Sequence, residues 1–168
     1  FIDLSSRGWD QAVELRSTYL DHIDVVYSSH LNRAYETVTP LALSRCLTIF
    51  KNERLSELDY AGQAQIFHQR IKENPDFRYS GGETIAEARE RFNTEVQKLA
   101  QENISKTVVI ATHGTVLSEF LIHHFDFDED CFFELSYPDV YEVIWENNAF
   151  VATKRLVAVL PESTENYA

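Results

Sequence analysis

Cysteine, glycine and methionine are scarce in this sequence of 168 residues, which contains two, five and none of them. The two cysteines, Cys46 and Cys131, form neither a C-x-x-C pair nor a disulfide framework. We therefore expect two buried or half-buried thiols in a reducing compartment. No apolar run approaches the ~18 residues that a membrane span needs, and no secretory signal is visible at the start of the sequence. Both absences predict a cytoplasmic protein without a membrane partner.

Basic residues are also few compared with acidic ones. The chain has 15 basic and 27 acidic residues, which gives a formal net charge of −12 with histidine neutral. Such a surface repels nucleic acids and anionic membranes, so neither is expected as a partner. An anionic substrate would need a local cluster of cations set against the overall field. The length corresponds to about one domain, and the hydrophobic fraction of 44% is that of an ordinary globular protein.

Apolar residues recur at helical spacing in four segments, and short apolar runs lie between them. The expected helices cover residues 4–20, from 31 onwards, from 84 to about 99, and 115–125, with a further short helix over 65–73. Pro40 should kink or end the second of these. The expected strands cover 24–27, 47–50, 107–111, 140–145 and 150–156, the last two forming a hairpin around Asn147-Asn148.

Two helix and strand signals are particularly clear. Thr84 and Glu87 have the spacing of a capping box at the start of the third helix. Residues 107–111 are apolar and β-branched without alternation, which predicts a strand buried on both faces. Alternating strands and helices predict an α/β fold, a three-layer sandwich with a largely parallel central sheet flanked by helices. We expect a single domain over residues 1–168.

Active sites in such sheets lie at the carboxyl ends of the strands. Two strand ends carry reactive side chains. One is Tyr27-Ser28-Ser29, which leads to Arg33, and the other leads through Ala111 and Thr112 to His113 and Gly114. Arg33 could bind a phosphate with its planar guanidinium, and His113 could meet an anion beside the first amides of a helix. Gly114 would let the backbone approach that ligand closely.

A third candidate, Glu57, lies in the irregular middle of the chain and could be a general acid if burial raises its pKa. Ordinary roles remain open for all three residues: a capping or core histidine, a solvated helix arginine and a surface carboxylate. Glu83 is expected to stabilise the start of its helix. The other histidines show no spacing of metal ligands, so no metal site is predicted. Neither G-x-G-x-x-G nor G-x-x-x-x-G-K-[ST] occurs, which argues against a generic nucleotide-binding domain.

The order of these segments resembles the histidine phosphatase superfamily, which includes cofactor-dependent phosphoglycerate mutases and many small phosphatases. Leu4 to Ala12 resembles the family's "L-T-x-x-G-x-x-Q-A" block, and Tyr27 to Thr37 resembles "Y-S-S-P-L-x-R-A-x-x-T", with His30 in place of the usual proline. Three further stretches resemble the block of the catalytic acid, the "G-G-E-S" helix start and the strand that ends in "S-H-G": residues 55–60, 81–84 and 108–114. The five blocks follow the family's order from residue 4 to about 120.

The resemblance implies a role for each candidate residue. Arg33 would hold the phosphoryl oxygens, His113 and Gly114 would contact the same group, and Glu57 would protonate the leaving oxygen and then activate water. The family's nucleophile is a histidine in an "R-H-G" block at the end of its first strand, and no such block occurs between Phe1 and Ala168. No metal or cofactor is implied. The implied partner is a small phosphorylated substrate, and a homodimer is left open.

Two explanations account for the missing block. In the family, the first strand lies inside the sheet beside the strand that here ends near His113, and an interior strand is costly to delete because its neighbours lose their hydrogen bonds. We therefore expect the block upstream of Phe1 in an active phosphatase. The alternatives are a catalytically inactive phosphate-binding or scaffold protein, and a strand supplied by a partner chain. By analogy with the family, whose mutases usually carry extra segments, a phosphatase is preferred to a mutase because the segment between Glu57 and Gly81 is short here.

Overall fold

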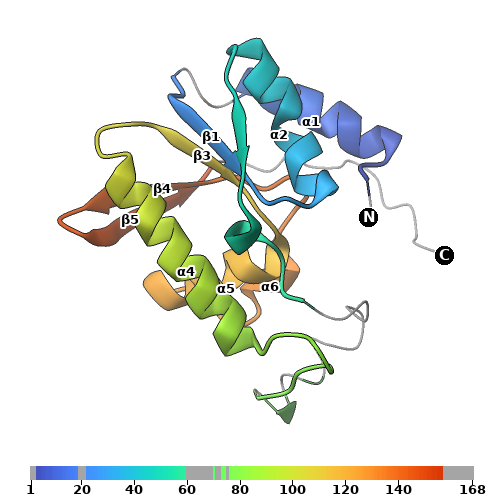
Figure 1. The fold of residues 1–168 in the computed structure, drawn as a ribbon, viewed down its shortest axis with the longest axis vertical. Coiled ribbons are helices and arrows are strands. Elements are labelled where there is room, and N and C mark those ends of the chain that lie inside the picture. The colour runs from blue at the N-terminus through green and yellow to red at the C-terminus, as the bar shows by residue number, and fades with distance from the viewer. Residues whose placement is uncertain (1–2, 19–21, 60–69, 71–72, 75, 157–168) are drawn as a thin grey trace.

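The computed structural model describes residues 3–18, 22–59, 70, 73–74 and 76–156 (Figure 1). The helices in this part of the chain are α1 (Ser6–Thr18), α2 (Asn32–Ser44), η1 (Glu53–Leu55, a 3₁₀ turn), α4 (Ile85–Glu102), α5 (Gly114–His124) and α6 (Cys131–Glu134). The strands are β1 (Val25–Ser28), β2 (Ile49–Lys51), β3 (Val108–Ala111), β4 (Tyr141–Glu146) and β5 (Ala149–Arg155). None of the described helices combines the length and apolarity required to cross a membrane.

The central sheet is parallel and has the strand order β2-β1-β3. Its register pairs Ser28 with Lys51 on one side and with Ala111 on the other. The three strands therefore end at the same edge of the sheet, where the sequence places its candidate site residues. Helices cover both faces, so the predicted α/β sandwich is confirmed (Figure 1).

Two apolar clusters pack the helices against the two faces of the central sheet. On one face of the sheet, Val26 packs against α2 in a cluster completed by Ile23, Val38, Leu41 and Ala42. On the other face, Tyr27 and Ile110 pack against a larger cluster that α4 and α5 provide, with Phe92 and Phe120 in edge-to-face contact at 6.0 Å between ring centroids. The alternation of Val26 and Tyr27 between the two clusters is the two-residue period of a strand with both faces covered.

Local sequence signals identified two elements well. Thr84 and Glu87 form the predicted capping box, with Glu87 N–H donating to Thr84 Oγ1 at 3.1 Å and Thr84 N–H donating to Glu87 Oε2 at 2.9 Å. The β4–β5 hairpin turns at Asn147 and Asn148, whose φ angles of 50° and 62° fit the two-residue turn that asparagine favours. The short helix predicted over 65–73 falls almost entirely outside the described residues.

One expectation is narrowed by the structure and another was wrong. Pro40 does not end its helix early, because α2 continues to Ser44, while the alternative effect, a kink, stays a prediction. Proline removes one backbone hydrogen bond, but Val38, Leu41 and Ala42 are buried around it, and their packing holds the helix against the sheet. Cys46 is exposed, not buried or half-buried, because it lies in the turn after α2 at a φ of 54°; Cys131 is buried as expected.

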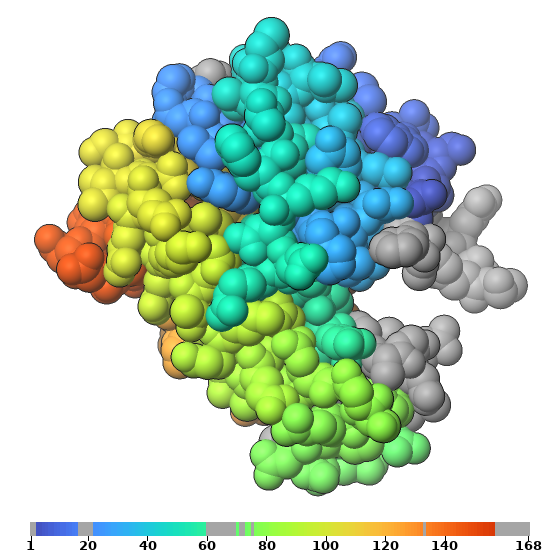
Figure 2. All heavy atoms as spheres, viewed as in Figure 1, coloured from blue at the N-terminus to red at the C-terminus, as the bar shows by residue number. Residues whose placement is uncertain are grey.

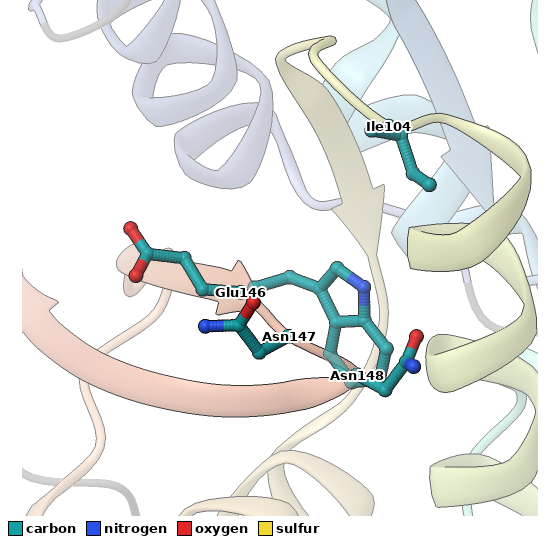
Figure 3. A pocket seen from close by; sticks show the side chains of 5 residues that line it. Ile104, Glu146, Asn147 and Asn148 are labelled. Carbon is teal, nitrogen blue, oxygen red and sulfur yellow. The ribbon is translucent and has the colours of Figure 1, made fainter.

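The strand β3 also differs from its prediction. All four of its residues are half-buried, although their apolar run predicts burial on both faces. The reason is that β3 pairs with β1 along one edge, while no described strand pairs with its other edge. A cavity of about 390 Å³ separates Ile104, just before β3, from the β4–β5 turn at 145–148 (Figure 3). The hairpin and the central sheet are therefore two separate sheets in this part of the chain.

Candidate active site

Arg33 and His113 come from the carboxyl ends of neighbouring strands. Arg33 is the second residue of α2, which follows β1, and His113 is the N-cap of α5, which follows β3. Parallel pairing continues past the strands, because Ser29 N–H donates to the Ala111 carbonyl at 2.9 Å. The sheet thus brings together two side chains that lie 80 positions apart in the sequence.

A cavity of about 530 Å³ opens beside this edge of the sheet. Its wall comes from three parts of the chain: the start of α2, the segment from η1 to Asp59, and the start of α4. Figure 2 shows the η1 segment (teal) lying between α2 (light blue) and α4 (yellow-green). The polar side chains that line the cavity are His30, Arg33, Glu53, Ser56, Glu57, Asp59, Glu83 and Arg91. It includes two of the three predicted chemical groups, Arg33 and Glu57, but not His113.

The Arg33 guanidinium has no partner among the described residues. It forms no hydrogen bond or ion pair with any described residue, whereas Arg54, Arg78, Arg89, Arg91 and Arg155 all form ion pairs with carboxylates. Its positive charge reaches both Glu57 and His113, because it lowers the pKa of each. A half-buried arginine without a carboxylate partner at a cavity wall is well placed to bind an external anion.

Glu57 caps the start of α5. Its carboxylate accepts hydrogen bonds from the backbone N–H groups of Leu58 at 2.9 Å, Thr115 at 3.2 Å and Val116 at 3.4 Å. Burial raises the pKa of Glu57 above its ordinary value, and these amides and the Arg33 charge only partly offset that rise. Glu57 is therefore shifted toward the protonated form that a general acid needs. Glu57 also accepts hydrogen bonds from amides of α5 that we expected to face a bound anion.

His113 is buried, with only 8% exposed, and is not among the residues that line the cavity. Its Nε2 is 2.8 Å from the hydroxyl of Ser29. Burial lowers the pKa of His113 to about 3, and the positive charges of Arg33, His30 and Arg91 add to that effect. The ring is therefore neutral at pH 7 and acts as a hydrogen-bonding group, not as a cation.

Gly114 is enclosed by aromatic side chains. A Cβ at this position would lie 2.7 Å from the Tyr137 hydroxyl and 3.0 Å from Cε2 of Phe132. Close packing against these two rings accounts for the glycine, while the predicted contact between Gly114 and a ligand stays a prediction. Tyr137 belongs to the aromatic segment after α5. Burial raises the pKa of Tyr137, and the charge of Glu57 adds to this rise. This segment therefore borders the site.

Sequence reasoning missed Arg91. Its guanidinium donates to both carboxylate oxygens of Glu83 at 2.7 and 2.8 Å, and to three backbone carbonyls of the η1 segment, those of Arg54 at 2.8 Å, Ser56 at 3.0 Å and Glu57 at 3.4 Å. One arginine of α4 thus fixes the backbone that carries Glu57. Glu83, expected to stabilise the start of its helix, pairs with Arg91, and its effect on the helix stays a prediction.

We expect Arg91→Leu to destabilise the protein by about 3 kcal/mol, because it leaves Glu83 and three carbonyls of a half-buried site without their donor. Urea unfolding at pH 7.5 measures the loss. The control is Arg78→Leu, which removes an exposed ion pair to Glu87 and should cost less than about 1 kcal/mol. Equal losses in the two variants would mean that Arg91 does not hold the η1 segment in place.

No group of three histidine, cysteine or carboxylate side chains suited to a metal ion occurs in the part of the chain that the structure describes. Arg33, whose guanidinium has no partner among the described residues, and Glu57, a carboxyl with a raised pKa, line one cavity, and the neutral ring of His113 lies at the neighbouring strand end. Together they can bind a phosphoryl group, donate a hydrogen bond to it and protonate an oxygen that leaves it.

Comparison with known proteins identifies the family. The chain matches the family described as histidine phosphatase superfamily (branch 1) over residues 2–156. It is 30% identical over 124 residues to phosphoserine phosphatase 1 of Hydrogenobacter thermophilus, an alignment that covers 66% of this chain and 59% of the relative. The chain thus spans about three fifths of the length of this curated relative.

Solved structures share the fold. A phosphoserine phosphatase from Entamoeba histolytica, solved in complex with 3-phosphoglyceric acid, superposes with a TM-score of 0.77 at 19% identity, over 94% of this chain and 86% of that one. YhfR from Bacillus stearothermophilus gives a TM-score of 0.71 at 23% identity, over 88% of this chain and 81% of that one. At these identities the likeness concerns the fold.

Proposed function

Because this chain belongs to the histidine phosphatase superfamily, we propose that it is a phosphomonoester hydrolase that acts through a phosphohistidine on a small phosphorylated metabolite. The observation that carries the proposal is the uncommitted Arg33 guanidinium at a cavity that it shares with Glu57. Arg33 binds the phosphoryl oxygens. The neutral ring of His113 donates a hydrogen bond to them when its proton lies on Nδ1, because Nε2 is already bonded to Ser29. Glu57 protonates the leaving oxygen and later accepts a proton from the attacking water.

The nucleophilic histidine is assigned to a strand that is not among those described. The open edge of β3 and the cavity near Ile104 support a strand seated between β3 and the β4–β5 hairpin. Such a strand, parallel to β3, ends at the same edge of the sheet as Ser28 and Ala111. A histidine at its carboxyl end would lie beside the site, where the phosphoryl group could pass to it and then to water.

Phosphoserine is the first substrate to test, since the chain resembles a protein named for that activity. The natural protein that contains this chain should hydrolyse phosphoserine or a related phosphorylated acid without added metal. Acid-labile, base-stable phosphate bound to the protein during turnover would identify the phosphohistidine. Residues 1–168 alone should bind inorganic phosphate without hydrolysing an aryl phosphate. Turnover by that chain alone would contradict the role given to the additional strand.

A catalytically inactive phosphate-binding protein is the second candidate, because no R-H-G block occurs in the sequence. Phosphate binding without turnover in the natural protein would favour it. A phosphoglycerate mutase-type transfer is the third, and it predicts that the phosphate reappears on a second hydroxyl of the substrate and not in solution.

We expect Glu57→Gln to reduce kcat/KM for an alkyl phosphate about 100-fold or more, but for p-nitrophenyl phosphate much less, because a good leaving group needs little protonation. The measurement compares both substrates in each variant. Glu102→Gln, a change to an exposed carboxylate at the end of α4 that does not line the cavity, is the control and should leave both rates nearly unchanged. Equal losses for the two leaving groups would remove Glu57 from the role of general acid.

A further inference from the structure

A continuous row of hydrogen bonds joins His30, at the cavity wall, to the buried His113. His30 Nδ1 is 2.7 Å from the Ser56 hydroxyl oxygen. That oxygen is 3.2 Å from the hydroxyl of Ser29, which in turn is 2.8 Å from Nε2 of His113. Ser29 is fully buried and Ser56 is 9% exposed, so the row is shielded from water over most of its length.

The protons in this row can be arranged in only a few ways. Ser29 Oγ already accepts a hydrogen bond from the Leu31 N–H at 3.2 Å. One lone pair of this oxygen is therefore taken. The hydroxyl can donate to either Ser56 or His113, and it must accept from the other. Ser56 has the same two choices, because its hydroxyl has no third partner among the described residues and an unsatisfied buried donor is costly. The row therefore runs in one direction or in the other.

When both histidines are neutral, the row runs outward. His113 Nε2–H donates to Ser29, Ser29 donates to Ser56, and Ser56 donates to His30 Nδ1. Each ring then has its proton on Nε2, which is the more stable tautomer of a free neutral imidazole side chain. When His30 is charged, its Nδ1–H must donate, which reverses the whole row. Ser29 then donates to His113 Nε2, so the His113 proton lies on Nδ1.

We propose that His30 and His113 form a proton relay through Ser56 and Ser29. A proton that reaches Nδ1 of His113 displaces the proton of Nε2 onto Ser29. The hydroxyl proton of Ser29 passes to Ser56, and that of Ser56 passes to Nδ1 of His30. One proton has been gained, His113 is still neutral with its proton on Nδ1, and the positive charge lies on His30. Loss of a proton from His113 Nδ1 reverses each transfer.

The two ends of the row differ in how well they tolerate charge. His113 is buried near Arg33 and Arg91, whose charges together with its burial disfavour the imidazolium. His30 is half-buried at a cavity wall on which carboxylates outnumber cations. The charged groups on that wall are Arg33 from α2, Glu53 from η1, Glu57 and Asp59 after it, and Glu83 and Arg91 from the start of α4. The relay thus moves the charge away from the buried position near Arg33 and Arg91.

For catalysis the inference rests on the proposed function, in which His113 faces the phosphoryl group. The relay would let this ring exchange a proton there without becoming charged, and would add a cation to the wall that also carries Arg33. The hydrogen-bond row itself is a property of the chain and can be tested without turnover. In this role His30 is a positioning residue for His113.

The test is a pH titration of ¹⁵N-histidine-labelled protein from pH 8 to 5, with two-bond ¹H–¹⁵N correlation spectra that show which ring nitrogens carry protons. We expect His113 to remain neutral and to change its protonated nitrogen from Nε2 to Nδ1 in the same step in which His30 gains a proton on Nδ1. In Ser56→Ala and in His30→Ala, His113 should keep one tautomer throughout. Ser44→Ala, which removes a serine hydroxyl bonded to the Leu41 carbonyl outside the row, should leave the coupling intact.

A His113 tautomer that stays unchanged when His30 Nδ1 gains a proton in the unmodified protein would overturn the relay, whether or not any variant folds. So would a coupling that persists in Ser56→Ala. The proposed function fails by other measurements, namely absence of phosphate binding and of turnover. A relay observed in a protein that neither binds nor hydrolyses phosphate would refute the function and leave the relay standing.

Discussion

Replacing Arg33 with alanine is expected to lower kcat/KM for phosphomonoester hydrolysis about 100-fold or more, the size expected from losing a preorganised charge contact to the reacting group. The guanidinium forms no ion pair with a described carboxylate, so its loss leaves no buried charge behind and the fold should be little affected. The same change should weaken the binding of inorganic phosphate to residues 1–168 at least about tenfold, or about 1.4 kcal/mol.

Two variants sharpen this experiment. Arg33→Lys keeps the charge but loses the planar pair of donors, so its activity should lie between those of the wild type and the alanine variant. Arg7→Ala removes an exposed arginine of α1 and should change neither activity nor phosphate binding. Undiminished activity in Arg33→Ala would remove this residue from the site.

Replacing His113 with glutamine is expected to lower kcat/KM by a similar factor and also to change the acid stability of the protein. Folding holds the pKa of His113 at about 3, whereas an unfolded histidine has its ordinary value of 6.5. Between these two values the unfolded chain binds more protons, so stability falls as the pH is lowered from 6.5 toward 3. At pH 4 the contribution amounts to about 3 kcal/mol.

Urea unfolding at pH 7.5 and pH 4.5 measures this effect. The stability of His113→Gln should decrease less between the two pH values than that of the wild type, because glutamine does not titrate. His22→Gln, a change to a histidine whose side chain is 77% exposed, is the control and should follow the wild type. A parallel decrease in His113→Gln and the wild type would mean that His113 is not held neutral by the fold.

The features that could be predicted are those that depend on residues close together in the sequence. The capping box at Thr84 and the turn at Asn147-Asn148 depend on residues within four positions of one another. The convergence of Arg33 and His113 followed from one further rule, that parallel strands end at the same edge of a sheet. Glu57 was located by its resemblance to a known block, and its raised pKa follows from burial that no sequence pattern reports.

What could not be predicted depends on long-range geometry. Arg91 meets carbonyls that lie 34 to 37 positions earlier, and a backbone carbonyl has no sequence signature. The partner of His30 is Ser56, which lies 26 positions later in the sequence. No regular spacing connects the two residues, so no sequence pattern could predict their contact. The continuation of α2 beyond Pro40 is similar, because buried neighbours outweigh a local helix-breaking preference.

The pairing of β1 with β3 has a consequence for the order in which the protein becomes functional during its synthesis. Ser29 and His113 are 84 positions apart, so a growing chain can form α2 and pair β1 with β2 well before β3 is available. β3 must leave the ribosome before it can pair with β1, and contacts over such distances form late in folding. Arg33 is therefore synthesised well before His113, and the site that the proposed function requires is complete only after β3 has been added to the sheet.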